Sequence, residues 1–218
     1  MRSQGTPDIV LETRGVEHQF SPGRGLHAAT FSHQGAGCVA VLGANGAGKS
    51  TLLRIVAGLL KPTRGSLELR IEGRAIPPAE RRQVVGYASP ELAFYDELTV
   101  GENLLFAAEA RGLDDRPGRM RKALERVELI AREHDRVAAL SSGMKQRLRL
   151  AFAVLSEPPL LLLDEPGSHL DAAGRAVTAS IVVAHRETGL VLLATNDPQE
   201  TTLANSKLEL SRGVGDPT

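Results

Sequence analysis

Short apolar runs alternate with segments of helical periodicity along most of the chain. Apolar runs of strand length predict buried strands at residues 38–42, 160–163 and 190–194. Helical patterns predict helices at residues 51–59, 99–111 and 171–187. This alternation favours an α/β fold, with a mostly parallel sheet and helices on both of its faces. Ligands of such sheets bind at the carboxyl ends of the strands, so we expect a site there.

The amino-terminal part has a different pattern. Ile9 and Leu11 alternate with polar neighbours, and residues 26–31 can form another strand. Between them, residues 15–25 contain glycines that predict two turns. These strands and turns predict a small antiparallel β layer at the opening of the chain. After the first helix, residues 67–71 again alternate apolar and polar positions, which predicts a strand with one solvent-exposed face.

Length and pattern together predict one domain. A chain of 218 residues suits a single compact domain, which we expect over residues 8–213. The pattern turns helical after the first strands, which predicts a helical subdomain at about residues 90–156, with a capping box from Thr99 to Glu102. We expect residues 1–7 and 214–218 to be tails, the first of them mobile.

Charge and cysteine content exclude some classes of protein. Lysine plus arginine and aspartate plus glutamate both number 26, so the formal net charge is zero and no nucleic-acid partner is expected. The single cysteine, Cys38, lies in a predicted buried strand and has no intrachain partner, which favours a reduced, cytoplasmic setting. No apolar run reaches the length of a membrane span.

The strongest motif follows the strand at residues 38–42. Residues 43–50 read Gly-Ala-Asn-Gly-Ala-Gly-Lys-Ser and fit the phosphate-loop pattern G-x-x-x-x-G-K-[ST], with a predicted helix after them. Glycines let backbone N–H groups converge on phosphate oxygens, and the helix N-terminus adds its positive end. Lys49 can reach the outer phosphates, and the Ser50 hydroxyl can ligate Mg²⁺.

Two carboxylates follow the leucine-rich strand. Asp164 can hold Mg²⁺, and Glu165 can polarise an attacking water, because neighbouring strand residues face opposite sides. By itself an Asp-Glu pair is also an ordinary polar strand end. The phosphate loop upstream favours the catalytic interpretation.

A third motif opens a helix. Residues 140–147 read Leu-Ser-Ser-Gly-Met-Lys-Gln-Arg, and serine hydroxyls with free N–H groups at a helix start bind anions. The alternative is a capped helix without a ligand.

Together these motifs resemble those of the ATP-binding cassette of ABC transporters. Residues 43–50 resemble its Walker A motif, residues 160–165 its Walker B motif, residues 140–146 its signature and residues 168–171 its D-loop. The signature departs from Leu-Ser-Gly-Gly-Gln at Ser142 and Met144. The resemblance implies a P-loop NTPase (RecA-like) fold that uses ATP and Mg²⁺.

The resemblance also assigns residues to roles. ATP binding is implied for Phe20, Gly43, Ala44, Asn45, Gly46, Ala47, Gly48, Lys49, Ser50, Thr51, Ser141 and Gly143. Catalytic roles are implied for Glu165, Lys49 and Asn196, and Mg²⁺ binding for Ser50 and Asp164. Phe20 falls where the family has an adenine-stacking aromatic, although an isolated phenylalanine in a β layer is packed core about as often.

Two family positions hold unusual residues. The glutamine that contacts Mg²⁺ and the attacking water is replaced by Pro90, which follows Ser89. The histidine that contacts the γ-phosphate is replaced by Asn196, which can donate a neutral hydrogen bond but cannot become cationic. We therefore expect hydrolysis that is retained but slow.

The resemblance implies a transport function. We expect the energy subunit of a membrane exporter, similar to small cassettes such as those of the cytochrome c maturation haem exporter and of ABC-2-type exporters. Two cassettes would pair head to tail, so that Ser141 and Gly143 of one close over nucleotide on the other, and permease subunits would hold the pair at the inner face of the cell membrane. The alternatives are a degenerate cassette that binds ATP as a regulatory clamp, and a soluble ABC ATPase acting on ribosomes or DNA.

Overall fold

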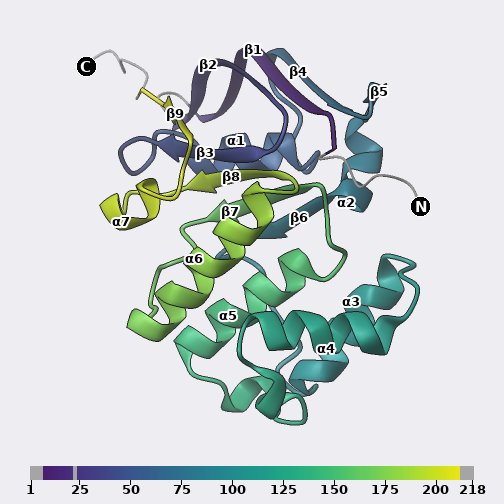
Figure 1. Cartoon of the computed structure of the whole chain (residues 1–218). Coiled ribbons are helices and arrows are strands. Elements are labelled where there is room, and N and C mark those ends of the chain that lie inside the picture. Colours follow the sequence, from purple (N-terminus) through teal and green to yellow (C-terminus); the bar gives the residue numbers. More distant parts are fainter. Residues whose placement is uncertain (1–6, 22–23, 212–218) are drawn as a thin grey trace.

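The computed structural model describes residues 7–21 and 24–211. The predicted tails lie outside these residues, apart from Pro7. The described part consists of an antiparallel sheet, a parallel sheet and a set of helices below the parallel sheet (Figure 1). This arrangement confirms the predicted α/β fold with its antiparallel layer and mostly parallel sheet.

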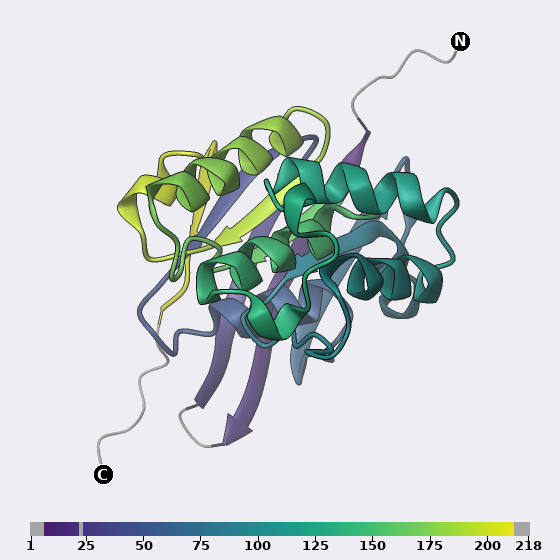
Figure 2. The same ribbon diagram turned by 90° about the horizontal axis from the view of Figure 1, so that it is seen from below.

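The antiparallel sheet has the strand order β2-β1-β4-β5. Its strands are β1 (Ile9–Ser21), β2 (Arg24–Gln34), β4 (Arg64–Ile71) and β5 (Arg74–Ala75). Alternate side chains of β1, such as Ile9 and Leu11, are fully buried, as the apolar alternation predicts. The carboxyl end of β1 and the start of β2 project beyond the parallel sheet (Figure 2).

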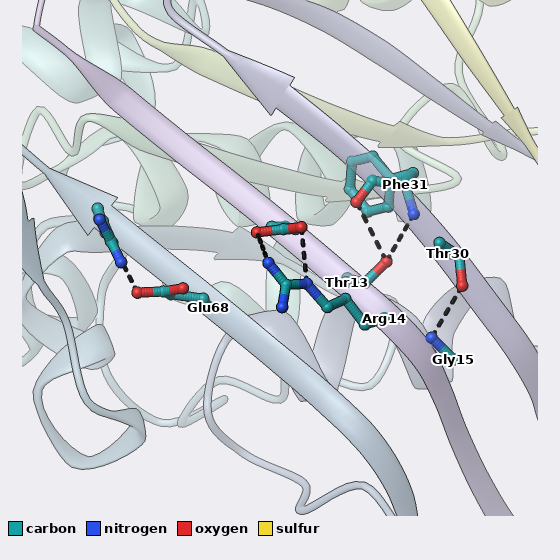
Figure 3. A network of polar contacts seen from close by, with 8 residues as sticks. Thr13, Arg14, Gly15, Thr30, Phe31 and Glu68 are labelled. Atoms are coloured by element: carbon teal, nitrogen blue, oxygen red, sulfur yellow. Dashed lines mark hydrogen bonds and ion pairs between the residues drawn. The ribbon is translucent and has the colours of Figure 1, made fainter.

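The prediction of two turns within residues 15–25 is wrong for residues 15–21, which belong to β1. β1 continues through Gly15, which has a positive φ of 56°, and the pairing with β2 shifts between Thr13 and Val16. This irregularity is a β-bulge, in which glycine adopts the left-handed conformation without leaving the strand. Gly15 N–H donates to Thr30 Oγ1 at 2.8 Å, and Phe31 N–H donates to Thr13 Oγ1 at 3.0 Å, so both strands stay connected past the bulge (Figure 3).

The parallel sheet has the strand order β6-β7-β8-β3-β9. Its strands are β3 (Gly37–Leu42), β6 (Val85–Ala88), β7 (Leu160–Asp164), β8 (Leu190–Ala194) and β9 (Ser206–Glu209). Every residue of β7 and β8 is buried, which agrees with their continuous apolar sequences. The three central strands, β7, β8 and β3, end side by side at the edge of the sheet that carries the site.

Helices cover both faces of the parallel sheet. Helix α1 (Lys49–Val56) lies between the two sheets, where its apolar residues join one core with β1, β3 and β8 (Figure 1). On the other face the long helices are α3 (Val100–Ala110), α4 (Arg116–Arg126), α5 (Ser142–Val154) and α6 (Ala172–Arg186). They enclose a second core against β7 and β8 (Figure 2).

Short helical segments complete the described chain. They are η1 (Pro78–Glu80), α2 (Arg81–Val84), η2 (Ile130–Arg132), η3 (Val137–Ala139) and α7 (Pro198–Thr201). The predicted capping box is present at the start of α3, because Glu102 N–H donates to Thr99 Oγ1 at 3.1 Å and Thr99 N–H donates to Glu102 Oε2 at 2.7 Å. Such a cap contributes on the order of 1 kcal/mol to helix stability.

Candidate nucleotide site

The glycine loop connects β3 to α1 by backbone conformations that other residues rarely adopt. Gly46 and Gly48 have φ values of 86° and 97°. A Cβ atom added at Gly48 would lie 2.8 Å from the Leu26 Cα atom, so a side chain at this position would collide with β2. The loop closes on itself through the Ala47 N–H, which donates to the Ala44 carbonyl at 2.9 Å. A glycine-rich loop that opens a helix is a common binding site for phosphate groups.

Lys49 is the first residue of α1, and its side chain is only 6% exposed. Its ammonium donates to the Gly43 carbonyl at 2.8 Å and to Asn196 Oδ1 at 3.2 Å. Asn196 Nδ2 in turn donates to Asn45 Oδ1 at 2.8 Å. The structure therefore brings Asn196, which follows β8, against both the lysine and the middle of the glycine loop.

The residues expected to hold Mg²⁺ lie together. Asp164 ends β7 with 3% exposure, and burial raises the pKa of its carboxyl group, while a hydrogen bond with the Ser50 hydroxyl opposes that shift. Tyr87 OH also faces Asp164 Oδ2, at 3.5 Å. A carboxylate and a hydroxyl are hard oxygen ligands, which fit Mg²⁺. No group of three or more His, Cys, Asp or Glu residues that could hold a metal occurs in the described ranges, so Mg²⁺ here would need further oxygens from ligand phosphates and water.

Glu165 lies at the same edge of the sheet. Its backbone leaves the strand with a φ of 48°, and its N–H donates to the Ala194 carbonyl at 2.8 Å. Its side chain faces a cavity of about 380 Å³ that the glycine loop also lines. The lining residues are Phe20, Arg24, Gly25, Asn45, Gly46, Gly48, Lys49, Ser50, Thr51 and Glu165. Lys49, Ser50 and Glu165 thus line one cavity.

Phe20 lies near the end of β1 and borders this cavity. Its side chain is 57% exposed and makes an edge-to-face contact with His18, with ring centroids 4.5 Å apart. The packed-core interpretation of Phe20 is therefore wrong, and its ring is available to stack on a base. The neighbouring Arg24, at the start of β2, also lines the cavity. The sequence analysis missed it, because nothing in the local pattern distinguishes Arg24 from other exposed arginines.

Ser141 and Gly143 do not line the cavity of their own chain. Ser141 caps α5, since its Oγ accepts from the Met144 N–H at 3.2 Å, and Gly143 lies near the backbone of His169. The sequence analysis did not predict a buried hydrogen bond made by the last residue of this motif: Gln146 Nε2 donates to the Pro166 carbonyl at 3.1 Å. The signature segment thus contacts the loop that carries Glu165.

The loop after β6 contains Pro90, which replaces the glutamine found at this position in the family. Ser89 is 8% exposed, and its Oγ accepts from the Glu91 N–H at 3.2 Å. Glu91 forms an ion pair with Arg54 of α1. Pro90 has no polar side-chain atom, so this position supplies no carboxamide to the site.

A strand, a glycine loop and a helix, with two carboxylates at the end of β7, which β8 separates from β3, define a P-loop nucleotide-binding protein. The sequence profile of the ABC transporter family matches residues 26–168, which is more than half of the chain. The chain belongs to the ABC transporter family.

Curated relatives cover most of this chain. The Fe(3+) ions import ATP-binding protein FbpC 2 of Rhodococcus jostii is 37% identical over 214 residues, which cover 94% of this chain and 60% of the relative. The energy-coupling factor transporter ATP-binding protein EcfA1 of Enterococcus faecalis is 33% identical, with 94% of this chain and 76% of the relative covered. The uncharacterized ABC transporter ATP-binding protein YxlF of Bacillus subtilis is 45% identical over 140 residues, which cover 63% and 46%. The chain thus spans only 46 to 60% of the length of YxlF and FbpC 2.

Solved structures match the fold. The ATP binding subunit of an ABC transporter superposes with a TM-score of 0.78 and 29% identity, covering 94% of this chain and 87% of the other. A dimeric ATP-binding cassette with bound ADP and Pi gives a TM-score of 0.80 at 22% identity, covering 93% and 95%. The predicted P-loop cassette fold is confirmed.

Proposed function

We propose that this chain binds ATP with Mg²⁺ and hydrolyses it as the energy subunit of an ABC transporter. The observation that carries the proposal is the convergence of Lys49, Ser50 and Glu165 on one cavity, beside the buried Asp164. Membership of the ABC transporter family supports it. We also propose that residues 8–213 form one ATPase domain, with a helical subdomain at about residues 90–156 that includes α3, α4 and α5.

We assign each residue of the cavity to one part of the bound nucleotide or to the attacking water. Backbone N–H groups of the glycine loop and the Lys49 ammonium bind phosphate oxygens, and the exposed Phe20 ring stacks on the base. Ser50 and Asp164 hold Mg²⁺, which when bound neutralises charge on the phosphate oxygens. Glu165 accepts a proton from the attacking water, and Asn196 donates a neutral hydrogen bond toward the outer phosphate.

The proposal includes two kinds of partner. A second cassette would bring its Ser141 and Gly143 over the nucleotide, which agrees with their position outside the cavity of their own chain. Permease subunits would hold the pair at the inner face of the membrane. No helix in the ranges 7–21 and 24–211 is long and apolar enough to cross a bilayer.

The direction of transport is the finer part of the proposal. The sequence analysis favours an exporter, whereas two relatives of this chain, FbpC 2 and the sulfate/thiosulfate import ATP-binding protein CysA of Brucella melitensis, are import proteins by name. Export therefore remains a prediction for the transporter of which this chain would be part. Co-purification with a polytopic membrane protein would test it, because the permease class identifies the direction, and recovery of an importer-type permease would overturn it.

A clamp that binds ATP without useful turnover is the second candidate. Two observations favour it: Pro90 supplies no carboxamide, and Asn196 occupies the position from which a histidine would contact the γ-phosphate. Steady-state phosphate release by the purified protein separates the two functions, with Lys49→Ala as the background. Release above that background supports the energy subunit. ATP binding with release equal to the background identifies the clamp.

A further inference from the structure

A buried carboxylate lies between the two loops that carry Glu165 and Asn196. It belongs to Glu200, which follows β8 in the short helix α7 and is 8% exposed. Burial raises the pKa of this carboxyl group, and a hydrogen bond from the Thr195 hydroxyl opposes the shift. Glu200 does not line the cavity of the glycine loop, and the proposed hydrolysis assigns it no role.

Glu200 anchors the loop after β8 through Thr195. The Thr195 hydroxyl donates to Glu200 Oε2, and the same hydroxyl oxygen accepts from the Asp197 N–H at 2.9 Å. Thr195 is 1% exposed, so water does not compete for these bonds. Residues on both sides of Asn196 are thereby fixed, with its carboxamide against Lys49 and Asn45.

Glu200 also contacts the loop after β7. A Cβ atom added at Gly167 would lie 2.3 Å from Glu200 Oε1, so the carboxylate packs directly on the backbone two residues beyond Glu165. This turn is closed by the Ser168 N–H, which donates to the Glu165 carbonyl at 3.1 Å. A side chain at Gly167 would push the carboxylate away from the turn.

We propose that Glu200 is a positioning residue that sets the placement of Glu165 relative to Asn196. Both of these residues line a second cavity of about 340 Å³, which Gly167, Thr195 and Glu200 border as well. Glu200 therefore acts through its neighbours and touches no reacting atom. The inference rests on the proposed ATP hydrolysis, in which Glu165 and Asn196 serve the same phosphate.

The test compares Glu200→Ala and Glu200→Gln with Thr178→Val. Thr178 is also buried, and within the described residues its hydroxyl bonds the Gly174 carbonyl of its own helix α6, so its loss controls for a general loss of stability. We expect kcat of Glu200→Ala to fall about tenfold to 100-fold, because small displacements of catalytic groups are costly. The dissociation constant of a fluorescent ATP analogue should stay within about threefold, because the glycine loop is unchanged.

Two further readouts separate positioning from a structural role. Glu200→Gln keeps an acceptor for Thr195 and the same volume, so it should restore most of the kcat. Hydrogen–deuterium exchange of peptides that span residues 165–168 and 195–197 should rise in Glu200→Ala at both loops, and at neither loop in Thr178→Val. Thr195→Val removes the hydroxyl from the same link and replaces Glu200→Ala where that variant does not fold.

Three results would overturn the inference. The first is a loss of nucleotide binding in Glu200→Ala that matches its loss of kcat. The second is a loss of kcat in Thr178→Val equal to that in Glu200→Ala. The third is increased hydrogen–deuterium exchange in only one of the two loops of Glu200→Ala. If the wild-type protein releases no phosphate, the proposed function fails instead. The exchange experiment then still decides whether Glu200 holds the two loops together.

Discussion

The two loops that meet at Lys49 are built in different ways. The glycine loop depends on backbone conformation, with Gly46 and Gly48 in the left-handed region and the Lys49 ammonium held by the Gly43 carbonyl. The loop after β8 depends on side chains, since the Thr195 hydroxyl and the Asn196 carboxamide make its contacts. A backbone-built loop tolerates few substitutions, whereas a side-chain-built loop accepts another residue that can donate a hydrogen bond.

This difference explains where the chain departs from its family. The fixed positions of the phosphate-loop pattern are all present at residues 43–50. Two of the departures, Pro90 and Asn196, lie in loops at other strand ends, and the other two, Ser142 and Met144, lie in the first turn of α5. We therefore expect variants of the glycine loop to change nucleotide binding, and variants of the other loops to change turnover.

The largest effect should come from Glu165→Gln, which tests whether turnover can be lost while binding is kept. Removal of a general base typically lowers the rate by about 10²–10⁴-fold, whereas Lys49 and Ser50 remain to bind ATP. We expect no phosphate release above background and an ATP-dependent dimer in size-exclusion chromatography. The exposed Glu187 at the end of α6 provides the control Glu187→Gln. Unchanged phosphate release in Glu165→Gln would remove this residue from the mechanism.

The second effect concerns the backbone-built loop and compares Gly48→Ala with Gly46→Ala. Both glycines have positive φ, but a Cβ atom meets Leu26 at Gly48 and nothing within 4 Å at Gly46. The left-handed conformation alone costs about 1–2 kcal/mol, so Gly46→Ala should show this loss in urea denaturation and Gly48→Ala a larger one. Equal losses would show that the contact with β2 relaxes without cost.

The sequence predicted the backbone-built part of the site better than the rest. The strands at 38–42 and 160–163 and the glycine loop follow from local apolar runs and a local motif, so their meeting at the sheet edge could be expected. The continuation of β1 through Gly15 could not, because a glycine in a strand pattern fits a turn as well as a bulge. Arg24, Glu200 and the contact of Gln146 with Pro166 could not be found either, since these contacts join residues far apart or loops whose path the sequence leaves open.

A third effect is expected at the hairpin tip, where the proposed base contact is a single exposed ring. Stacking of a base on an aromatic side chain is worth about 1–3 kcal/mol, so Phe20→Ala should weaken ATP binding about tenfold. Phe20→Tyr keeps the ring and should bind like the wild type. Binding of tripolyphosphate, which has no base, should be equal in all three proteins. A matching loss for tripolyphosphate would mean that Phe20 supports the hairpin and does not contact the base.

The smallest effect is expected from Asn196→His, which restores the family residue to the side-chain-built loop. Lys49 loses its 3.2 Å contact with Asn196 Oδ1 but keeps the Gly43 carbonyl at 2.8 Å, so nucleotide affinity should change little. An imidazole donates a hydrogen bond as the carboxamide does and can also become cationic, which favours turnover that is equal or higher. The comparison is Asn196→Ala, which leaves no side-chain donor at this position and should lower kcat. Loss of a donor that contacts the transition state lowers kcat by about 10²–10³-fold in the largest cases. A collapse of turnover in Asn196→His would show that the hydrogen bonds from Asn196 to Asn45 and Lys49 have a role that a histidine cannot fill. The loop after β8 would then depend on its side chain as strictly as the glycine loop depends on its backbone.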